Sequence, residues 1–331
     1  MRKFVSFFGE HSPVFDELNE KAAEYALERG FEYTWSIQKP FDKEEVIRLL
    51  SESDVGLIDI EPYDASIFTR IVPRCKLLVR FGVGFDKVNL ADATASGIAV
   101  ARTSGANSTG VAEMALTQIL AARRQLMINR KTVDSGVWVK NVGSELIGAT
   151  VGIVGFGAIG QLLAQLLQGF HCRILAFDPS DPVEAANALG VELCDFDTLI
   201  SQSDAVSIHT PYCPSTHHLF NADVLSRMKK DAVLVCTARG SIIDEDALYE
   251  ALKNKTIAAA GLDVYATEPL PKESPLIGLD NVILTPHVSS QTVESLMATY
   301  RKAIDIAADF YAGKPLSPRD LLNPNYAGQV D

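Results

Sequence analysis

The sequence is poor in cysteine, and its cysteines form no recognisable site. There are five in 331 residues, an odd number, and no two of them make a Cys-x-x-Cys pair. An odd and scattered set argues against a disulfide framework and against a zinc site. We therefore expect no bound metal and a reducing compartment, the cytoplasm.

Long apolar runs and clusters of positive charge are also absent. No segment approaches the roughly 20 apolar residues that a membrane-spanning helix needs, and the short run at residues 3–8 reads as a strand rather than a signal peptide. The formal net charge is −12, and no run of five or more basic residues occurs. Because that charge repels phosphate backbones, we expect neither a membrane nor a nucleic acid as partner.

What the sequence does contain is a regular alternation of short β-like runs with helical segments. One such series covers residues 3–102 and a second covers residues 150–285. Alternation of this kind is typical of a parallel sheet covered by helices. Two long helical segments, roughly residues 108–130 and 292–312, stand at the edges of the second series. The sequence therefore predicts an α/β protein with two doubly wound parallel sheets.

The lengths and order of these segments predict how the chain divides into domains. A chain of 331 residues exceeds the usual size of one domain. The long helices would carry the chain out of one domain and back into it, so that the second series is inserted into the first. We expect a discontinuous domain of residues 1–103 and 292–331, and an inserted domain of residues 104–291.

A glycine-rich turn opens the second series. It directly follows the apolar run 150–154 and directly precedes a helical segment. In such a turn the first glycine permits the tight bend, the second lets the backbone approach a pyrophosphate, and the third allows the helix to pack on the strand. The N–H groups at the start of the helix favour the anion. The predicted dinucleotide contacts are Gly155, Gly157, Ala158, Ile159 and Gly160.

Asp178 ends the next apolar run, 18 residues after Gly160. An acid about 20 residues beyond the glycines hydrogen-bonds the adenosine ribose of NAD, and it repels the 2′-phosphate of NADP. A solvated turn before Pro179 is the alternative interpretation. Because strand, glycines, helix, strand and acid occur together, the sequence predicts a site for NAD rather than NADP.

Polar residues follow three apolar runs further along the chain. They are Arg239, the acids Asp263 and Glu268, and His287. In open α/β sheets, ligands bind at the carboxyl ends of the strands. Reduction of a ketone by hydride needs a proton donor. Histidine is suited to this near neutral pH, and a nearby carboxylate holds its tautomer.

The remaining requirement of that chemistry is an anchor for the substrate. A guanidinium binds the carboxylate of a 2-oxo acid through two hydrogen bonds, so the candidate catalytic residues are Arg239, Glu268 and His287. Each residue also has a structural interpretation. The arginine could cap the connection between a strand and a helix, the histidine could be a hydrogen-bonded loop residue, and the glutamate could belong to a surface turn. His209 is expected to be structural.

The order of these motifs resembles the D-isomer-specific 2-hydroxyacid dehydrogenase family over almost the whole chain. The resemblance implies a Rossmann NAD-binding domain inserted into a flavodoxin-like substrate domain. It also implies NAD-dependent interconversion of a D-2-hydroxy acid and its 2-oxo acid. The matching segments are RFGVGFDKVNL, GIAVARTSGANSTGVAE, GFGAIG, HTPYCPSTHHLF, ARG, LDVYATEP and TPH.

The resemblance also implies a role for each site residue. Arg239 would bind and orient the substrate carboxylate, His287 would be the general acid/base, and Glu268 would pair with His287. The backbones of Val83 and Gly84 would contact the substrate. The further cofactor contacts implied are Asp263 and Thr237 at the nicotinamide carboxamide, Thr210, Pro211 and Thr216 in the loop over the cofactor, and Thr109 on the nicotinamide side.

Two pairs of residues depart from the family pattern. Ser289 and Ser290 stand where many relatives carry a small Gly or Ala pair, and Cys236 and Thr237 stand where an asparagine is common. Neither removes a catalytic residue. Both affect the shape expected for the substrate and nicotinamide pocket.

The sequence leaves the substrate open. Arg80 ends the run KLLVRFG, beside the proposed substrate loop, and an extra cation there could bind a second anionic group. Arg70 and Arg74 are as readily explained as a solvated basic face. Glyoxylate, hydroxypyruvate, pyruvate and a phosphorylated acid such as phosphohydroxypyruvate or 3-phosphoglycerate all remain candidates.

The resemblance further implies a homodimer formed through the inserted domain, with the helix at residues 108–130 and the region of Trp138 as contacts. The alternative to an enzyme is an NAD-sensing, corepressor-like binding protein. Proteins of the C-terminal-binding type resemble the same family and keep similar residues. In such a protein the cofactor would control partner binding, and turnover would be incidental.

Overall fold

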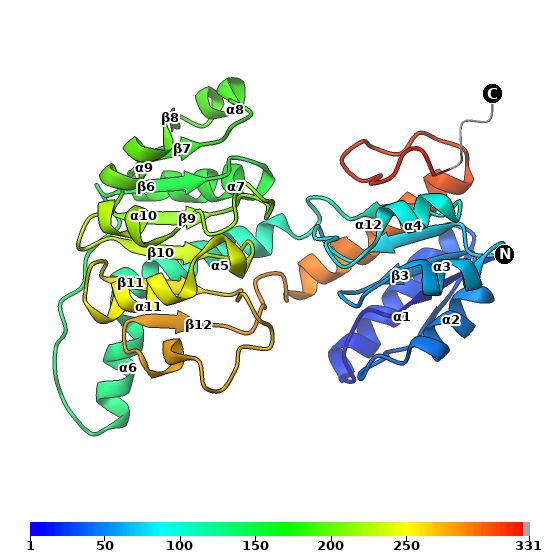
Figure 1. Cartoon of the computed structure of the whole chain (residues 1–331), viewed down its shortest axis with the longest axis horizontal. Coiled ribbons are helices and arrows are strands. Elements are labelled where there is room, and N and C mark those ends of the chain that lie inside the picture. The colour runs from blue at the N-terminus through cyan, green and yellow to red at the C-terminus, as the bar shows by residue number, and fades with distance from the viewer. Residues whose placement is uncertain (327–331) are drawn as a thin grey trace. The chain divides into compact units, whose positions relative to one another are not determined.

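The structure is a computed structural model in which residues 1–326 are described. The chain forms two compact units, drawn in Figure 1. The central unit comprises residues 108–291, and the terminal unit comprises residues 1–107 and those from 292 onward. The first boundary follows Asn107 instead of the expected Thr103, and residues 327–331 of the predicted terminal domain lie outside the described residues.

The central unit is built on a seven-stranded parallel sheet. Its order is β12-β11-β10-β9-β6-β7-β8, so the chain starts in the middle, builds one edge and then returns to build the other. This is the order of a Rossmann dinucleotide-binding fold with one strand added. The strands are β6 (Thr150–Val154), β7 (Arg173–Phe177), β8 (Glu192–Leu193), β9 (Ala205–Ile208), β10 (Val233–Cys236), β11 (Ala259–Leu262) and β12 (Val282–Leu284).

Apolar layers cover both faces of this sheet. Val151 and Ile153 of β6 join the layer that contains side chains of α5 (Ser108–Arg123) and α7 (Ala158–Leu167), whereas Val154 joins the opposite layer. A strand that is buried on both faces has a continuous run of apolar residues. Such runs can be recognised in the sequence, which explains why these strands were predicted. The other helices are α6 (Leu126–Asp134), α8 (Val183–Ala188), α9 (Phe196–Gln202), α10 (Ala222–Arg227) and α11 (Glu245–Lys253), with short 3₁₀ turns at Gln168–Phe170, Gly240–Ile242 and Pro275–Gly278.

The terminal unit has a five-stranded parallel sheet of order β2-β1-β3-β4-β5. This is the flavodoxin-like order, and together the two sheets confirm the predicted fold class. The strands are β1 (Arg2–Ser6), β2 (Phe31–Trp35), β3 (Val55–Ile58), β4 (Leu77–Arg80) and β5 (Ala99–Arg102). The helices are α1 (Pro13–Glu28), α2 (Lys43–Ser51), α3 (Ala65–Ile71), α4 (Leu90–Ala95) and α12 (Val293–Tyr311).

Residues that follow the central unit in the sequence complete the terminal unit. Leu296, Tyr300 and Ile304 of α12 belong to the same buried layer as Phe4 of β1. Beyond the helix, Leu321 forms a bridge with Ala101 of β5 at the edge of the sheet. The terminal unit therefore cannot complete its core until the chain has returned from the central unit.

Three details differ from the sequence-based prediction. The helix expected at residues 108–130 is two helices, α5 and α6, because Gln125 between them has a left-handed backbone with φ of 52°. The short helices α4 and α8 were not predicted. Each buries a single side chain, Ala93 and Ala186, so neither leaves a periodic apolar pattern in the sequence.

Candidate active site

The candidate catalytic side chains come from three neighbouring strands of the central unit. Arg239 follows β10, Glu268 lies in the loop after β11, and His287 follows β12. Because the three strands are parallel neighbours, their carboxyl ends meet at one edge of the sheet. That edge is where ligands bind in folds of this kind.

His287 and Glu268 form a direct hydrogen-bonded pair. Nδ1 of His287 lies 2.8 Å from Oε2 of Glu268, and Oε1 of the same carboxylate accepts the Tyr265 N–H at 3.0 Å. The carboxylate thus fixes the ring through Nδ1 and leaves Nε2 to face a ligand. The histidine side chain is 43% exposed, so a ligand can reach it.

The surroundings of Glu268 keep its carboxylate charged. Burial alone would raise its pKa, but the hydrogen bond and charge of His287, the Tyr265 N–H and the charge of Arg239 together hold the pKa below the ordinary glutamate value. Because the pKa is lowered, the contribution of this carboxylate to stability is present at neutral pH. It is lost only as the pH falls through the lowered value.

Arg239 lies within electrostatic reach of that pair, since its charge is one of the causes that lower the pKa of Glu268. Its Nη1 donates to the Ala238 carbonyl at 2.7 Å. The next residue must be glycine, because a Cβ at Gly240 would lie 1.9 Å from the backbone of Tyr265. This close approach holds the arginine against the loop that carries Glu268. The structure therefore brings Arg239, Glu268 and His287 together.

Asp263 organises the loop that carries His287. Its carboxylate is fully buried and accepts the N–H groups of Val288 and Ser289 at 2.9 and 2.8 Å, as well as the hydroxyls of Thr285 and Ser289. Four hydrogen bonds use the lone pairs of a carboxylate. Asp263 thus has a structural task besides the nicotinamide contact that the resemblance implies, and sequence reasoning missed its partners Thr285 and Ser289.

The glycine turn has the geometry of a pyrophosphate site. A Cβ at Gly155, whose φ is +94°, would lie 2.5 Å from the Thr210 nitrogen, and a Cβ at Gly160 would lie 2.3 Å from the Gly155 carbonyl oxygen. A Cβ at Gly157 would meet no atom within 4 Å. The first and third glycines are therefore required by packing, whereas the second leaves open space at the N-terminus of α7.

A hydrogen bond joins Asp178 to this turn. Its Oδ2 accepts the Phe156 N–H at 2.8 Å, and its Oδ1 accepts the N–H and hydroxyl of Ser180 at 2.9 and 2.7 Å. Burial would raise its pKa, but these hydrogen bonds outweigh burial and lower it. A negative charge is therefore fixed at the end of β7, beside the glycines.

A substitution at Gly157 separates ligand binding from folding. In Gly157→Ala the added methyl group meets open space, so we expect an unfolding temperature close to that of the unchanged protein. The same methyl group would occupy space that a pyrophosphate approaches, and NADH should bind about tenfold more weakly. Thermal unfolding and a fluorescence titration with NADH measure the two effects. Gly160→Ala is the contrasting variant, because its Cβ clashes with backbone and should lower stability.

The other predicted cofactor residues lie at or near the same edge. Thr237 directly follows β10 and is buried, and its hydroxyl has no hydrogen-bond partner among residues 1–326. In the loop after β9, Thr216 accepts the Cys213 N–H at 2.8 Å and donates to the Pro211 carbonyl at 2.9 Å, which shapes the segment that also contains Thr210. Thr109 is exposed in the first turn of α5.

His209 has the structural role expected of it. Its Nε2 bonds the Ser207 hydroxyl at 2.8 Å, and burial lowers its pKa to about 4. The ring is therefore neutral at pH 7 and not available as an acid.

The predicted substrate contacts of the terminal unit lie at the carboxyl edge of its own sheet. Arg80 ends β4, and Val83 and Gly84 follow in the next turn. The guanidinium of Arg80 is almost fully buried, with Nη1 3.8 Å from Oδ1 of Asp59. A counter-ion this close weakens the case for a second anion site at Arg80.

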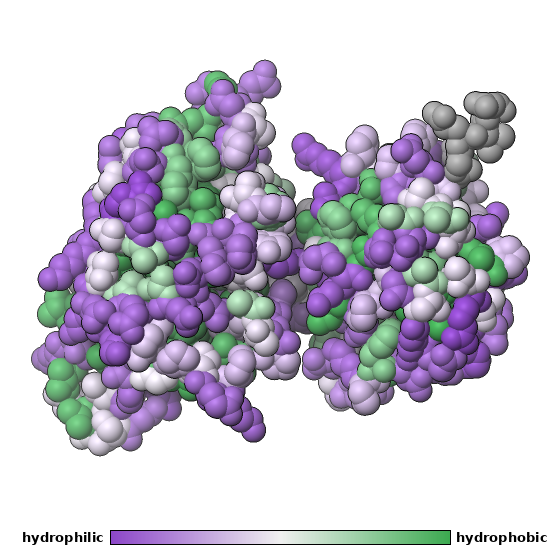
Figure 2. Space-filling model, viewed as in Figure 1, coloured by the Kyte–Doolittle hydropathy of each residue, from purple (hydrophilic) through white to green (hydrophobic). Residues whose placement is uncertain are grey.

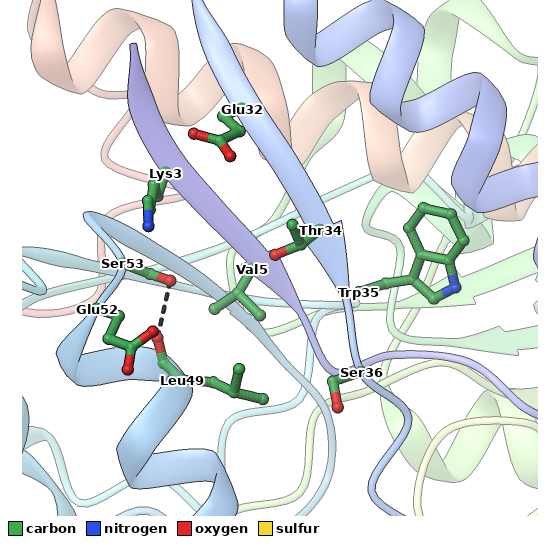
Figure 3. A pocket seen from close by; sticks show the side chains of 9 residues that line it. All are labelled: Lys3, Val5, Glu32, Thr34, Trp35, Ser36, Leu49, Glu52 and Ser53. Carbon is green, nitrogen blue, oxygen red and sulfur yellow. Dashed lines mark hydrogen bonds between the residues drawn. The ribbon is translucent and has the colours of Figure 1, made fainter.

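A separate hollow of about 200 Å³ occurs in the terminal unit (Figure 3). Strands β1 and β2 and helix α2 line it, and none of the predicted site residues does. One hydrogen bond is drawn between residues that line the hollow: the Ser53 hydroxyl donates to the Leu49 carbonyl at 2.8 Å. This bond satisfies a carbonyl at the C-terminal end of α2.

Residues 1–326 hold no candidate metal cluster and no candidate membrane-spanning helix. In that part of the chain, no three His, Cys, Asp or Glu side chains are grouped so that they could hold a metal ion. Among the same residues, no helix has the length and apolar character needed to cross a membrane.

Comparison with known proteins identifies the family. The profile "D-isomer specific 2-hydroxyacid dehydrogenase, NAD binding domain" matches residues 116–289. Glyoxylate reductase of Korarchaeum cryptofilum is 36% identical over 312 residues, which cover 92% of this chain and 91% of that protein. D-3-phosphoglycerate dehydrogenase of Archaeoglobus fulgidus is 34% identical over 284 residues, which cover 85% of this chain and 54% of that protein.

A solved structure agrees with these relatives. The NAD-dependent formate dehydrogenase of Staphylococcus aureus in complex with NAD has 32% identity and a TM-score of 0.79, with 97% of this chain and 98% of that chain covered. The family expected from the sequence is thereby confirmed. The chain belongs to the D-isomer-specific 2-hydroxyacid dehydrogenases and is an NAD-dependent oxidoreductase.

Proposed function

We propose that this protein reduces a small 2-oxo acid to the D-2-hydroxy acid with NADH, and catalyses the reverse oxidation with NAD. The observation that carries the proposal is the 2.8 Å pair between His287 and Glu268, with Arg239 at the end of a neighbouring strand. An acid–base group, its orienting carboxylate and a cation for the substrate carboxylate are the three groups this reaction needs.

Each side chain has one task in this mechanism. Nε2 of protonated His287 donates a proton to the carbonyl oxygen, and Glu268 stabilises the imidazolium and holds its orientation. Arg239 pairs with the substrate carboxylate and polarises the neighbouring carbonyl. Bound NADH supplies the hydride. The open space over Gly157 and the unpartnered Thr237 hydroxyl, the latter judged over residues 1–326, fit that cofactor.

We further propose a preference for NADH over NADPH. The fixed charge of Asp178 would accept a hydrogen bond from a ribose hydroxyl and repel a 2′-phosphate. We expect kcat/KM to be at least tenfold higher with NADH. Equal or higher efficiency with NADPH would remove this role from Asp178.

A panel of substrates tests the function itself. NADH oxidation is followed with glyoxylate, hydroxypyruvate, pyruvate and phosphohydroxypyruvate, and turnover above about 1 s⁻¹ with any of them supports the enzyme. Tight NADH binding without turnover on the whole panel would favour the corepressor-like alternative instead.

We also propose a homodimer formed through the central unit. Helix α6 buries none of its side chains, and exposed apolar residues continue along the segment after it (Figure 2). A patch this apolar marks a protein interface. Sedimentation should give the mass of a dimer, and Trp138→Ser should weaken it. The residues of the patch are Leu126, Met127, Val133, Val137, Trp138, Val139, Val142 and Ile147.

A cytoplasmic location completes the proposal. All five cysteines are free thiols, which suits a reducing compartment. Cell fractionation with an antibody to the protein would test this placement.

A further inference from the structure

The turn that carries His287 has an unfavourable backbone conformation. His287 has a φ of 54°, in the left-handed region that residues other than glycine seldom adopt. Such a conformation persists only where surrounding contacts hold it. The His287 N–H donates to the Thr285 carbonyl at 3.0 Å. The N–H groups of the next two residues, Val288 and Ser289, donate to the buried carboxylate of Asp263. The position of the imidazole therefore depends on how that carboxylate is held.

Two side-chain hydroxyls hold the Asp263 carboxylate, one on each oxygen. The Thr285 hydroxyl donates to Oδ1, which also accepts the Val288 N–H. The Ser289 hydroxyl donates to Oδ2, which also accepts the N–H of the same serine. Each oxygen thus accepts two hydrogen bonds, which is the capacity of a carboxylate oxygen. The carboxylate can neither rotate nor shift without losing a bond from one of the two hydroxyls.

A buried glutamine directs the Thr285 hydroxyl. Gln118 lies on α5 and is 1% exposed, and its Nε2 donates to Oγ1 of Thr285 at 3.2 Å. Because that oxygen accepts a bond from the amide, its own hydrogen is left to point at Asp263. The packing makes room for the glutamine, since a Cβ at Gly261 on β11 would lie 2.9 Å from the Cβ of Gln118.

Packing alone does not explain a glutamine at this place. Gln118 belongs to the buried face of α5, where Ala115, Ile119 and Ala122 are apolar. Its Oε1 is buried and has no hydrogen-bond partner among residues 1–326. An unpartnered buried carbonyl lowers stability, and an apolar side chain of similar shape would avoid that loss. The bond that Gln118 donates to Thr285 is what distinguishes it from such a side chain.

We propose that Gln118 and Ser289 are positioning residues for the proton transfer of the proposed function, on which this inference rests. They hold the carboxylate of Asp263 in place, and that carboxylate holds the turn of His287. Gln118 acts on Oδ1 through Thr285, whereas Ser289 acts directly on Oδ2. All of these residues belong to the central unit. A reacting group displaced by about 1 Å can lower a rate about 10²-fold, so a looser turn should slow the chemical step.

Two substitutions loosen the carboxylate without changing its charge. Gln118→Met keeps an unbranched side chain and removes the bond to Thr285, and Ser289→Ala removes a hydroxyl but keeps the N–H bond to Asp263. In each variant we expect the first-order rate constant of NADH oxidation to fall about tenfold, and the Kd for NADH to stay within about threefold. Gln118→Met should unfold at the temperature of the unchanged protein or higher, because the unpartnered carbonyl is gone.

A single-turnover experiment separates positioning from a structural role. The protein is first bound to NADH and then mixed rapidly with a saturating concentration of the acid of the panel that the unchanged protein reduces best. The amplitude of NADH oxidation reports how much protein is active, and the rate constant reports how fast each active molecule reacts. Lost positioning lowers the rate constant, whereas a loss of folded protein lowers only the amplitude.

The controls make the same two changes at the opposite end of the same sheet. Gln168→Met and Ser203→Ala lie before β7 and β9, at the amino ends of the strands. Gln168 donates to the Leu189 carbonyl at 2.8 Å, and Ser203 donates to the Leu199 carbonyl at 2.7 Å. Both controls lose a hydrogen bond far from the turn, so their rate constants should equal that of the unchanged protein.

Three results would overturn the inference. If Gln118→Met and Ser289→Ala react as fast as their controls, the two residues do not position the histidine, and the proposed function stands. If only the amplitude falls, they support folding alone. If the unchanged protein oxidises NADH with no acid of the panel, the inference and the proposed function fail together. Because the two substitutions act on different oxygens, a failure of one variant to fold leaves the other to decide.

Discussion

Replacement of His287 by asparagine is expected to lower kcat for 2-oxo acid reduction about 10² to 10⁴-fold. An amide cannot donate the proton that the imidazolium is proposed to supply. Asparagine is a better choice than alanine because residue 287 has a φ of 54°, a left-handed conformation that asparagine tolerates. The loop should therefore keep its shape while the acid–base group is lost.

Steady-state kinetics and NADH binding must be measured on the same preparation. We expect the Kd for NADH to stay within about threefold, because the cofactor contacts proposed for the glycine turn are untouched. The matched control is His171→Asn. This histidine is exposed and has a φ of 50°. It precedes β7, so it lies at the amino ends of the strands, whereas His287 lies at their carboxyl ends. A kcat near that of the unchanged protein in His287→Asn would remove the histidine from the mechanism.

The parts of the fold that could be predicted from the sequence are those determined by residues close together in the chain. The glycine turn is an example, because the strand before it, the helix after it and the three glycines follow one another directly. Gly160 packs against Gly155 within the turn, whereas the contact of Gly155 with Thr210 comes from the loop after β9. Helices α4 and α8 could not be found in this way, because a helix that buries one alanine has no apolar face to detect.

The candidate catalytic residues could be proposed from the sequence, but the residues that support them could not. Arg239, Glu268 and His287 stand out because each follows an apolar strand within a few residues, and ligands of open α/β sheets bind beyond the carboxyl ends of the strands. The supports depend on contacts across the fold. Ser289 was noted only as a departure from the family pattern, yet its hydroxyl bonds Asp263, 26 positions earlier. The register that pairs Ile58 with Arg80 places Asp59 beside that arginine, and the sequence gives no sign of this register.

Arg239→Lys should lower kcat/KM for the 2-oxo acid by about 10² to 10³-fold, or roughly 3 to 4 kcal/mol of transition-state stabilisation. Lysine keeps the positive charge but lacks the planar fork that binds a carboxylate through two hydrogen bonds. The backbone should not move, because Gly240 still packs against Tyr265. Arg227→Lys is the control, since that arginine also forms carboxylate pairs, with Asp197 and Asp223, on the surface of the same unit.

The way the loss divides between kcat and KM decides what Arg239 does. If the guanidinium both anchors the carboxylate and polarises the carbonyl, KM rises and kcat falls together. If it only anchors the substrate, KM rises while kcat at saturation stays the same, because ground state and transition state lose the same binding. A fall in kcat/KM no larger than that of Arg227→Lys would mean that Arg239 caps the end of β10 and does not bind the substrate. The 2-oxo acid carboxylate would then need another partner at this edge of the sheet.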